Sequence, residues 1–223
     1  RVLIPLDDAA AGAPSHSIHL KPLAEDALSL PVRTGKARVI GIEPASLVTK
    51  SLVREVKTDD AGCFQSALNP GLTKIAVIER HKRTGKLGIG ILEGYGLTGG
   101  AIATTISHDS HNIVVAGDND PDMLLAVREL ADMGGGIVSV HGGSIRRLPL
   151  PIAGLMTSAD PQEVNAVLHD MLVAARAELG IPEDVEPFMT LSFMALPVIP
   201  ELKLTARGLF NVNTFSFVGV EAD

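Results

Sequence analysis

The run HDSHN, which begins at His108, gathers the side chains best suited to chemistry. His108 and His111 can exchange protons near neutral pH, and Asp109 adds a carboxylate beside them. Two imidazoles and a carboxylate suit zinc, manganese or iron, or a general acid–base pair. Ser110 and Asn112 can hold a substrate through hydrogen bonds. We therefore predict that His108, Asp109 and His111 are catalytic and that Ser110 and Asn112 bind substrate, with metal ligation by the first three left open.

A structural interpretation of the same run stands beside the catalytic one. Histidine, aspartate and asparagine at strand ends often cap turns and satisfy backbone groups. The run lies between two apolar segments, 101–107 and 113–116, where polar side chains cost free energy unless they are satisfied or functional. An extended backbone would point His108 and His111 to opposite faces, whereas a turn would bring them together.

Glu79, Arg80 and His81 form a second candidate group, at the end of the apolar segment KIAVIE. Ligands bind preferentially at strand ends in open α/β sheets. Arg80 can hold an anion of the substrate, while Glu79 and His81 can move protons, so we add these two to the catalytic candidates. The alternative is a solvated charged loop continuing into Lys82 and Arg83.

Short segments rich in isoleucine and valine must position these candidates. Their length and composition favour buried strands over helices. The predicted strands are residues 37–42, 74–79, 87–92, 101–107 and 113–116, a hairpin of 136–141 with 145–148 around Gly142–Gly143, an apolar run 187–200, and residues 208–218 as a terminal strand or extended tail.

Two helices are signalled by their ends and by apolar spacing. The first follows Asp120, taken as its cap, with Pro121 at the first helical position. The second follows Asp160 and ends before Gly180. Strands mixed with few helices predict an α/β or α+β fold, built on a mixed β-sheet with a few packed helices.

Composition narrows the classes of partner. The 223 residues are 46% hydrophobic, carry a formal net charge of -7 and contain one cysteine, Cys63. Clustered positive charge is missing from the sequence, so we expect no nucleic-acid or membrane partner. A lone cysteine suits a reducing compartment, and we expect a cytoplasmic protein.

Several strings resemble, in order and spacing, the C-terminal domain of the adenine deaminases of the amidohydrolase superfamily. They are VIERH (77–81), GAIATTISHDSHNIVVAGDNDPDM (100–123), GGGIVSV (134–140), LPLPIAGLM (148–156) and PFMTLSFMALPVIPELKLT (187–205). The resemblance covers residues 37–218. It implies domains at 37–223, the C-terminal domain, and at 1–36, the end of a small β-rich flanking domain.

The resemblance also implies a hydrolase that acts on the carbon–nitrogen bond of a cyclic amidine, converting adenine to hypoxanthine and ammonia. In that family a (β/α)₈ barrel holds the main metal ligands, and Mn²⁺ or Fe²⁺ activates water. The sequence has no His-x-His motif, and 223 residues are fewer than the ~250 of a typical barrel. We therefore expect an amidohydrolase barrel partner outside this chain, a homo-oligomer, and no activity from this chain alone.

Three functions remain open at this point. The chain can complete the active site of adenine deaminase, with the segments HDSHN and ERH at its mouth. It can instead be a non-catalytic domain that stabilises the barrel or the oligomer. It can also be a free-standing metal-dependent hydrolase with His108, Asp109 and His111 as ligands.

Overall fold

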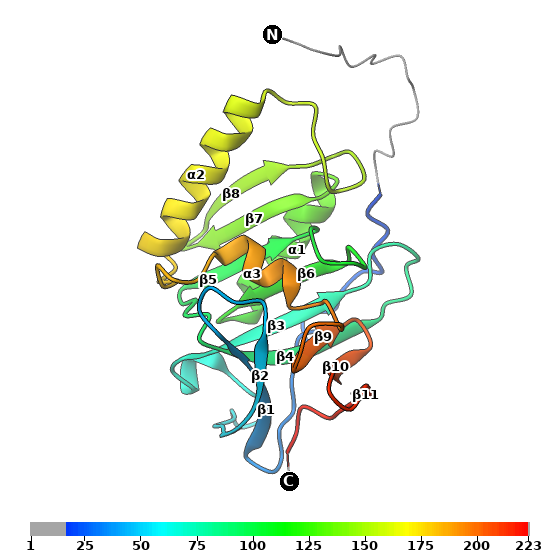
Figure 1. Ribbon diagram of the computed structural model, residues 1–223, viewed down its shortest axis with the longest axis vertical. Helices are drawn as coiled ribbons and strands as arrows, with labels where there is room; N and C mark the ends of the chain where they lie inside the picture. Colours follow the sequence, from blue (N-terminus) through cyan, green and yellow to red (C-terminus); the bar gives the residue numbers. More distant parts are fainter. Residues whose placement is uncertain (1–16, 223) are drawn as a thin grey trace.

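The computed structural model describes residues 17–222, which fold around one large mixed β-sheet (Figure 1). The elements are β1 (Lys36–Ile42), β2 (Thr49–Glu55), a 3₁₀ turn η1 (Ser66–Leu68), β3 (Leu72–Ile78), β4 (Leu87–Glu93), β5 (Gly100–Thr104), β6 (Ile113–Gly117), α1 (Asp120–Asp132), β7 (Gly136–His141), β8 (Ser144–Pro149), α2 (Pro161–Ala177), α3 (Pro187–Phe193), β9 (Leu202–Thr205), β10 (Gly208–Asn211) and β11 (Ser216–Phe217). The predicted fold class, a mixed sheet with a few helices and no barrel, is confirmed.

The large sheet has eight strands in the order β2-β1-β4-β3-β6-β5-β7-β8. Its neighbouring strands are antiparallel except for β1 and β4, which run parallel. Strands β3, β5 and β6 lie at its centre and are almost completely buried, which accounts for their continuous apolar sequences. The candidate segments ERH and HDSHN follow β3 and β5, so the antiparallel pairs β3–β6 and β5–β6 bring them to one edge.

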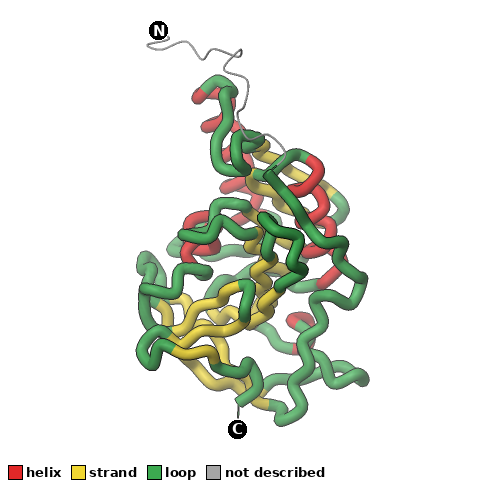
Figure 2. The backbone as a smooth tube through the Cα atoms, turned by 90° about the vertical axis from the view of Figure 1, so that its right-hand side faces the viewer, coloured by secondary structure: helices red, strands yellow, loops and turns green. Residues whose placement is uncertain are grey.

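Side chains of the central strands alternate between two apolar layers. Ile75 and Val77 of β3 pack in a cluster that includes α2, α3 and the small sheet, whereas Ala76 and Ile78 pack in a cluster with α1. Helices therefore lie on both sides of the strands, as the turned view shows (Figure 2). The sheet is therefore the middle layer of the fold, and the loops of the candidate site follow its strand ends.

The last third of the chain adds α3 and a small antiparallel sheet, β11-β10-β9, to one face of the large sheet. The predicted strand at 187–200 is wrong, because residues 187–193 form α3. Pro187 occupies the first turn, and the Glu186 side chain caps the helix by accepting a hydrogen bond from the Met189 N–H. The predicted terminal strand 208–218 is two short strands, β10 and β11, joined by a turn.

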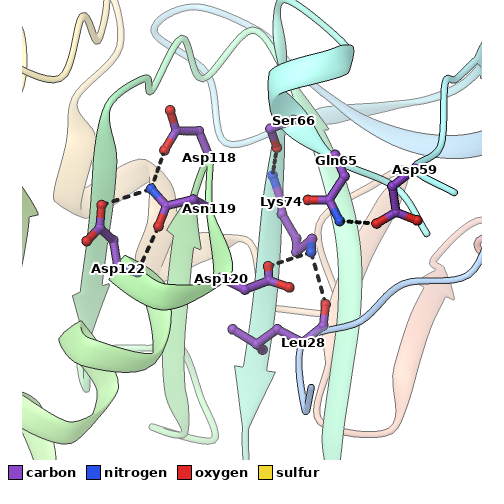
Figure 3. A network of polar contacts seen from close by, with 9 residues as sticks. All are labelled: Leu28, Asp59, Gln65, Ser66, Lys74, Asp118, Asn119, Asp120 and Asp122. Carbon is purple, nitrogen blue, oxygen red and sulfur yellow. Dashed lines mark hydrogen bonds and ion pairs between the residues drawn. The ribbon is translucent and has the colours of Figure 1, made fainter. Parts of the chain in front are cut away.

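The start of α1 is built around a buried lysine on β3 (Figure 3). Lys74 Nζ donates to Asp120 Oδ1 at 2.5 Å and to the Leu28 carbonyl at 3.0 Å. The cap of α1 is Asn119, whose Oδ1 accepts from the Asp122 N–H at 2.9 Å. The prediction that Asp120 caps this helix is therefore wrong, and Asp120 instead neutralises a lysine inside the sheet.

Residues 17–36 lie against the same sheet. Leu28 packs in the α1 layer, and Leu30 and Val32 pack with β1 and Phe64. The assignment of residues 1–36 to a flanking domain stays a prediction, and residues 1–16 of that segment fall outside the described residues. In the described part of the chain, no helix has the length and apolar character needed to cross a membrane.

Candidate functional site

The loop that carries HDSHN begins where β5 ends, three residues earlier than predicted. Thr105 stops the strand: its Oγ1 accepts from the Gly136 N–H at 2.8 Å and donates to the Gly154 carbonyl. Further along, the His111 N–H donates to the Ser107 carbonyl at 2.6 Å and closes a turn. This turn brings the imidazoles of His108 and His111 to 5.7 Å between ring centroids, edge to face. Of the two geometries considered from sequence, the structure has the turn.

The five side chains of HDSHN differ in exposure. Asp109 and Ser110 are exposed, His108 and His111 are half-buried, and Asn112 is buried. His108 packs against Phe193 of α3 with ring centroids 4.5 Å apart, and its N–H donates to the Ser192 carbonyl at 3.0 Å. The aromatic contact and the backbone contact fix one imidazole against the helix while the tip of the loop stays open to solvent.

Arg80, in the ERH segment, links that segment to the HDSHN loop. It is 1% exposed, its Nε donates to the His111 carbonyl, and its terminal nitrogens donate to Ser17 Oγ at 3.0 Å and to the Ala153 carbonyl at 2.9 Å. Gly154 allows this approach, because its φ is +72° and a Cβ there would lie 3.0–3.2 Å from the guanidinium. These contacts give Arg80 a positioning role, and its predicted contact with substrate stays a prediction.

Glu79 and His81 flank Arg80 in the sequence, and only His81 contacts the HDSHN loop directly. His81 Nε2 lies 2.8 Å from the Ser110 carbonyl, so it contacts the backbone of HDSHN directly. The Glu79 carboxylate accepts from the N–H groups of His81, Lys82 and Thr84 and from the Thr84 hydroxyl. Burial opposes its ionisation, but these hydrogen bonds outweigh burial and lower the pKa of Glu79 to about 2.

We expect Glu79→Gln to destabilise the protein by about 1–2 kcal/mol at pH 7, because an amide nitrogen cannot accept the Thr84 hydrogen bonds. The native pKa lies below the unfolded one, so the carboxylate contributes fully above about pH 4.5 and loses its contribution as pH falls toward 2. Urea unfolding at pH 7 and pH 3 should show a smaller gap between the two proteins at pH 3. An equal gap at both pH values would contradict this account.

The environment of His111 favours the neutral imidazole. Burial is the largest cause, followed by the neighbouring His108 and the Arg80 guanidinium, and together they lower the pKa of His111. Its Nδ1 lies 3.3 Å from the Ser107 N–H, which can donate to it and leave Nε2 to carry the proton. A neutral imidazole beside a second one is suited to taking or relaying a proton.

Two grooves flank the HDSHN loop. One, of about 440 Å³, is lined by His108 together with Phe188, Met189 and Phe193 of α3. The other, of about 760 Å³, is lined on one side by Glu79, Asp109, Ser110 and Asn112 and on the other by residues after α3 and in the small sheet. Four of the five loop residues are thus divided between the grooves, whereas His111, His81 and Arg80 are in neither lining.

The second wall of the larger groove was not predicted from the sequence. Its aromatic members, Phe210, Phe215 and Phe217, lie about a hundred residues after the loop and were assigned only to a terminal strand. The alternation of apolar residues in 208–218 was the available signal. It did not indicate which partner those side chains would face, because that depends on how the small sheet folds back.

The described residues do not fit a metal centre of their own. Among residues 17–222, no group of three or more histidine, cysteine, aspartate or glutamate side chains lies close enough to hold a metal ion. His108, Asp109 and His111 therefore do not form a complete ligand set in this conformation.

Comparison with known proteins agrees with the resemblance seen in the sequence. The family described as "Adenine deaminase C-terminal domain" matches residues 46–216. The protein named adenine deaminase in Nitratidesulfovibrio vulgaris strain Hildenborough is 56% identical over 220 residues, covering 98% of this chain and 38% of that protein. "Adenine deaminase 2" of Carboxydothermus hydrogenoformans is 46% identical over 217 residues, covering 97% of this chain and 37% of that protein.

A third relative, the adenine deaminase of Clostridium acetobutylicum, is 44% identical over 205 residues, 92% of this chain and 36% of that protein. The chain thus spans less than two fifths of the length of the curated relatives it matches. The family match covers the large sheet except β1, the HDSHN loop, and the lining of the larger groove except Phe217. The chain belongs to the adenine deaminase C-terminal domain family.

Proposed function

We propose that this chain is the C-terminal part of an enzyme that hydrolyses adenine to hypoxanthine and ammonia, and that its HDSHN loop lies at the mouth of the active site. The proposal rests chiefly on the paired imidazoles of His108 and His111, held by Arg80 and α3 at an edge bordered by two grooves. The names of the relatives supply the reaction.

The reaction requires proton transfers, and the HDSHN loop carries two imidazoles that can make them. Water adds to the purine carbon that bears the amino group, the water loses a proton, and the amino group gains one before it leaves as ammonia. We propose that His111, whose pKa is lowered, accepts a proton and that His108, 5.7 Å away, relays or returns it. Asp109, at the exposed tip, is proposed to orient one imidazole or the substrate amine.

We propose that an amidohydrolase barrel outside this chain completes the site and holds manganese or iron, since residues 17–222 offer no three-ligand group. The barrel would supply activated water, while this chain supplies the histidine pair and closes the site. The complete protein is further proposed to be a cytoplasmic homo-oligomer.

Ammonia release from adenine tests the proposal. The complete protein, purified and loaded with manganese, should release ammonia and form hypoxanthine in equal amounts. Residues 1–223 expressed alone, checked for folding by circular dichroism and for intact mass, should release none. Turnover by residues 1–223 alone would show that the barrel is unnecessary, and a folded, manganese-loaded complete protein without turnover would overturn the proposed reaction.

The non-catalytic alternative keeps one specific observation in its favour. Arg80 and His81 contact the backbone of the HDSHN loop, and Glu79 holds the turn that carries His81, so these contacts form a structural network that needs no substrate. On that account the chain only stabilises the barrel or the oligomer, and the imidazoles of His108 and His111 are dispensable for turnover. The effect of removing each imidazole separates the two functions.

A further inference from the structure

The larger groove has an aromatic wall made by the C-terminal strands. Phe215 and Phe217 each meet Phe210 edge to face, with ring centroids 5.3 and 5.2 Å apart, so Phe210 forms the base of the wall. The Arg207 guanidinium lies 4.8 Å from the centre of the Phe217 ring and holds it in place. Phe215 is 77% exposed and Phe217 45% exposed. Exposed aromatic side chains that face polar groups across a groove are typical of a site that binds a ligand.

The opposite wall contains a buried hydrogen-bond acceptor without a donor. Asn112 is 8% exposed and lines the groove, and its Oδ1, which is closed to solvent, has no partner among residues 17–222. An unpaired buried amide oxygen costs on the order of 1–3 kcal/mol, so such groups are rarely left without a functional reason. Asp109 and Ser110, beside it, add further acceptors at the rim. This wall therefore suits a ligand that donates N–H hydrogen bonds.

The charges around the groove select against a strongly charged ligand. Glu79 and Asp109 stand against Lys86 and Arg207, so the formal charges of the lining cancel. A phosphate group would need a surplus of positive charge, which this lining lacks. The volume of about 760 Å³ falls within the ~300–1,000 Å³ typical of small-molecule sites. A flat, neutral, nitrogen-rich ring that carries N–H donors satisfies all three features.

We infer that this groove is the base-recognition site of the protein: Phe217 and Phe215 stack on the purine ring, and the Asn112 amide turns its Oδ1 toward the groove to accept a hydrogen bond from the amino group of the base. The inference rests on the proposed function for the choice of adenine among flat heterocycles. The aromatic residues that it makes specificity-determining, Phe215 and Phe217, lie outside HDSHN, in the small sheet and its turn. The free base is the ligand, and a nucleotide such as AMP is not, because its phosphate finds no matching charge.

Purine without an amino group is the probe, since it cannot be deaminated and its binding can be measured apart from turnover. Calorimetry on the complete protein should show that Phe217→Leu weakens purine binding about 5- to 100-fold, whereas Phe217→Tyr, which keeps the aromatic face, stays within about threefold of wild type. Val173→Ala, at a half-exposed apolar side chain on α2 outside the groove, should change nothing. Asn112→Leu should cost adenine more affinity than it costs purine, because only adenine has the amino donor.

Each result separates the groove from the proposed reaction. Purine binding that depends on the aromatic face of Phe217, in a protein that does not deaminate adenine, would keep the inference and remove the reaction. Normal deamination of adenine, with purine binding unaffected by Phe217→Leu, would keep the proposed reaction and reject the inference. If Phe217→Leu and Phe217→Tyr instead lower the melting temperature and leave purine affinity unchanged, the aromatic wall packs against protein and the inference is wrong. Tight binding of AMP would also overturn it.

Discussion

Replacing either His108 or His111 by alanine in the complete protein is expected to lower the turnover of adenine at least about a hundredfold. The two imidazoles lie 5.7 Å apart, on a loop whose turn exists because the His111 N–H meets the Ser107 carbonyl. That backbone contact survives both substitutions, so the loop should keep its shape while it loses a proton carrier. The measurement is the initial rate of ammonia release at saturating adenine and saturating manganese.

The matched control is His169→Ala, at an exposed histidine on α2, which should leave turnover within about twofold of wild type. The pH profile adds a readout that a purely structural role would not change. Loss of His111, the imidazole with the lowered pKa, should remove the acid limb of the rate profile. Near-normal turnover by folded His108→Ala and His111→Ala proteins would leave the non-catalytic domain as the function of this chain.

The fold was predictable where local sequence dominates packing. Segments such as β3 and β6, which consist mainly of aliphatic residues, are buried on both faces by the helices and the small sheet, and their apolar sequences predict this burial. The run 187–200 was misassigned because its apolar residues fit a buried strand or a short helix equally well. The Glu186 cap and Pro187 in the first turn favour the helix α3 over a strand, and both residues are visible in the sequence.

The candidate site was also predictable only in part. HDSHN was recognisable because five polar residues interrupt apolar strands, and the structure shows its histidines side by side. The contacts that hold the loop join residues far apart in sequence: Arg80 Nε reaches the His111 carbonyl, and Phe193 packs on His108. No spacing rule predicts such pairs, since they follow from the antiparallel register of β3, β6 and β5 and from the return of α3 across the sheet.

Asp120 illustrates how burial changes the meaning of a residue. From sequence it lies between Asn119 and Pro121, where an acidic side chain is typical of a helix cap. In the fold Asn119 takes that role, and Asp120 meets a lysine on the neighbouring strand whose side chain is only 3% exposed. A lysine in the middle of an apolar strand gives no indication in the sequence of which carboxylate will neutralise it.

We expect Asp120→Ala to destabilise the protein by about 3 kcal/mol, because it leaves the Lys74 ammonium buried without its counter-charge. The Lys74 Nζ–Asp120 Oδ1 distance is 2.5 Å, and the only other acceptor for that nitrogen among residues 17–222 is the Leu28 carbonyl (Figure 3). A single carbonyl dipole cannot replace a full negative charge in a site of low dielectric constant. Urea unfolding followed by circular dichroism at pH 7 gives the free energy of unfolding.

The double replacement Lys74→Met with Asp120→Ala identifies the physical cause. Methionine fills much of the volume of the lysine stem without a charge to desolvate, so the double variant should regain most of the loss seen in Asp120→Ala. Asp122→Ala is the matched control, since Asp122 is also acidic, lies in the same first turn of α1 and makes no contact with Lys74. It should cost less than about 1 kcal/mol. If the double variant is as unstable as Asp120→Ala alone, the buried charge is not the origin of the instability, and the geometry of the α1 terminus must be.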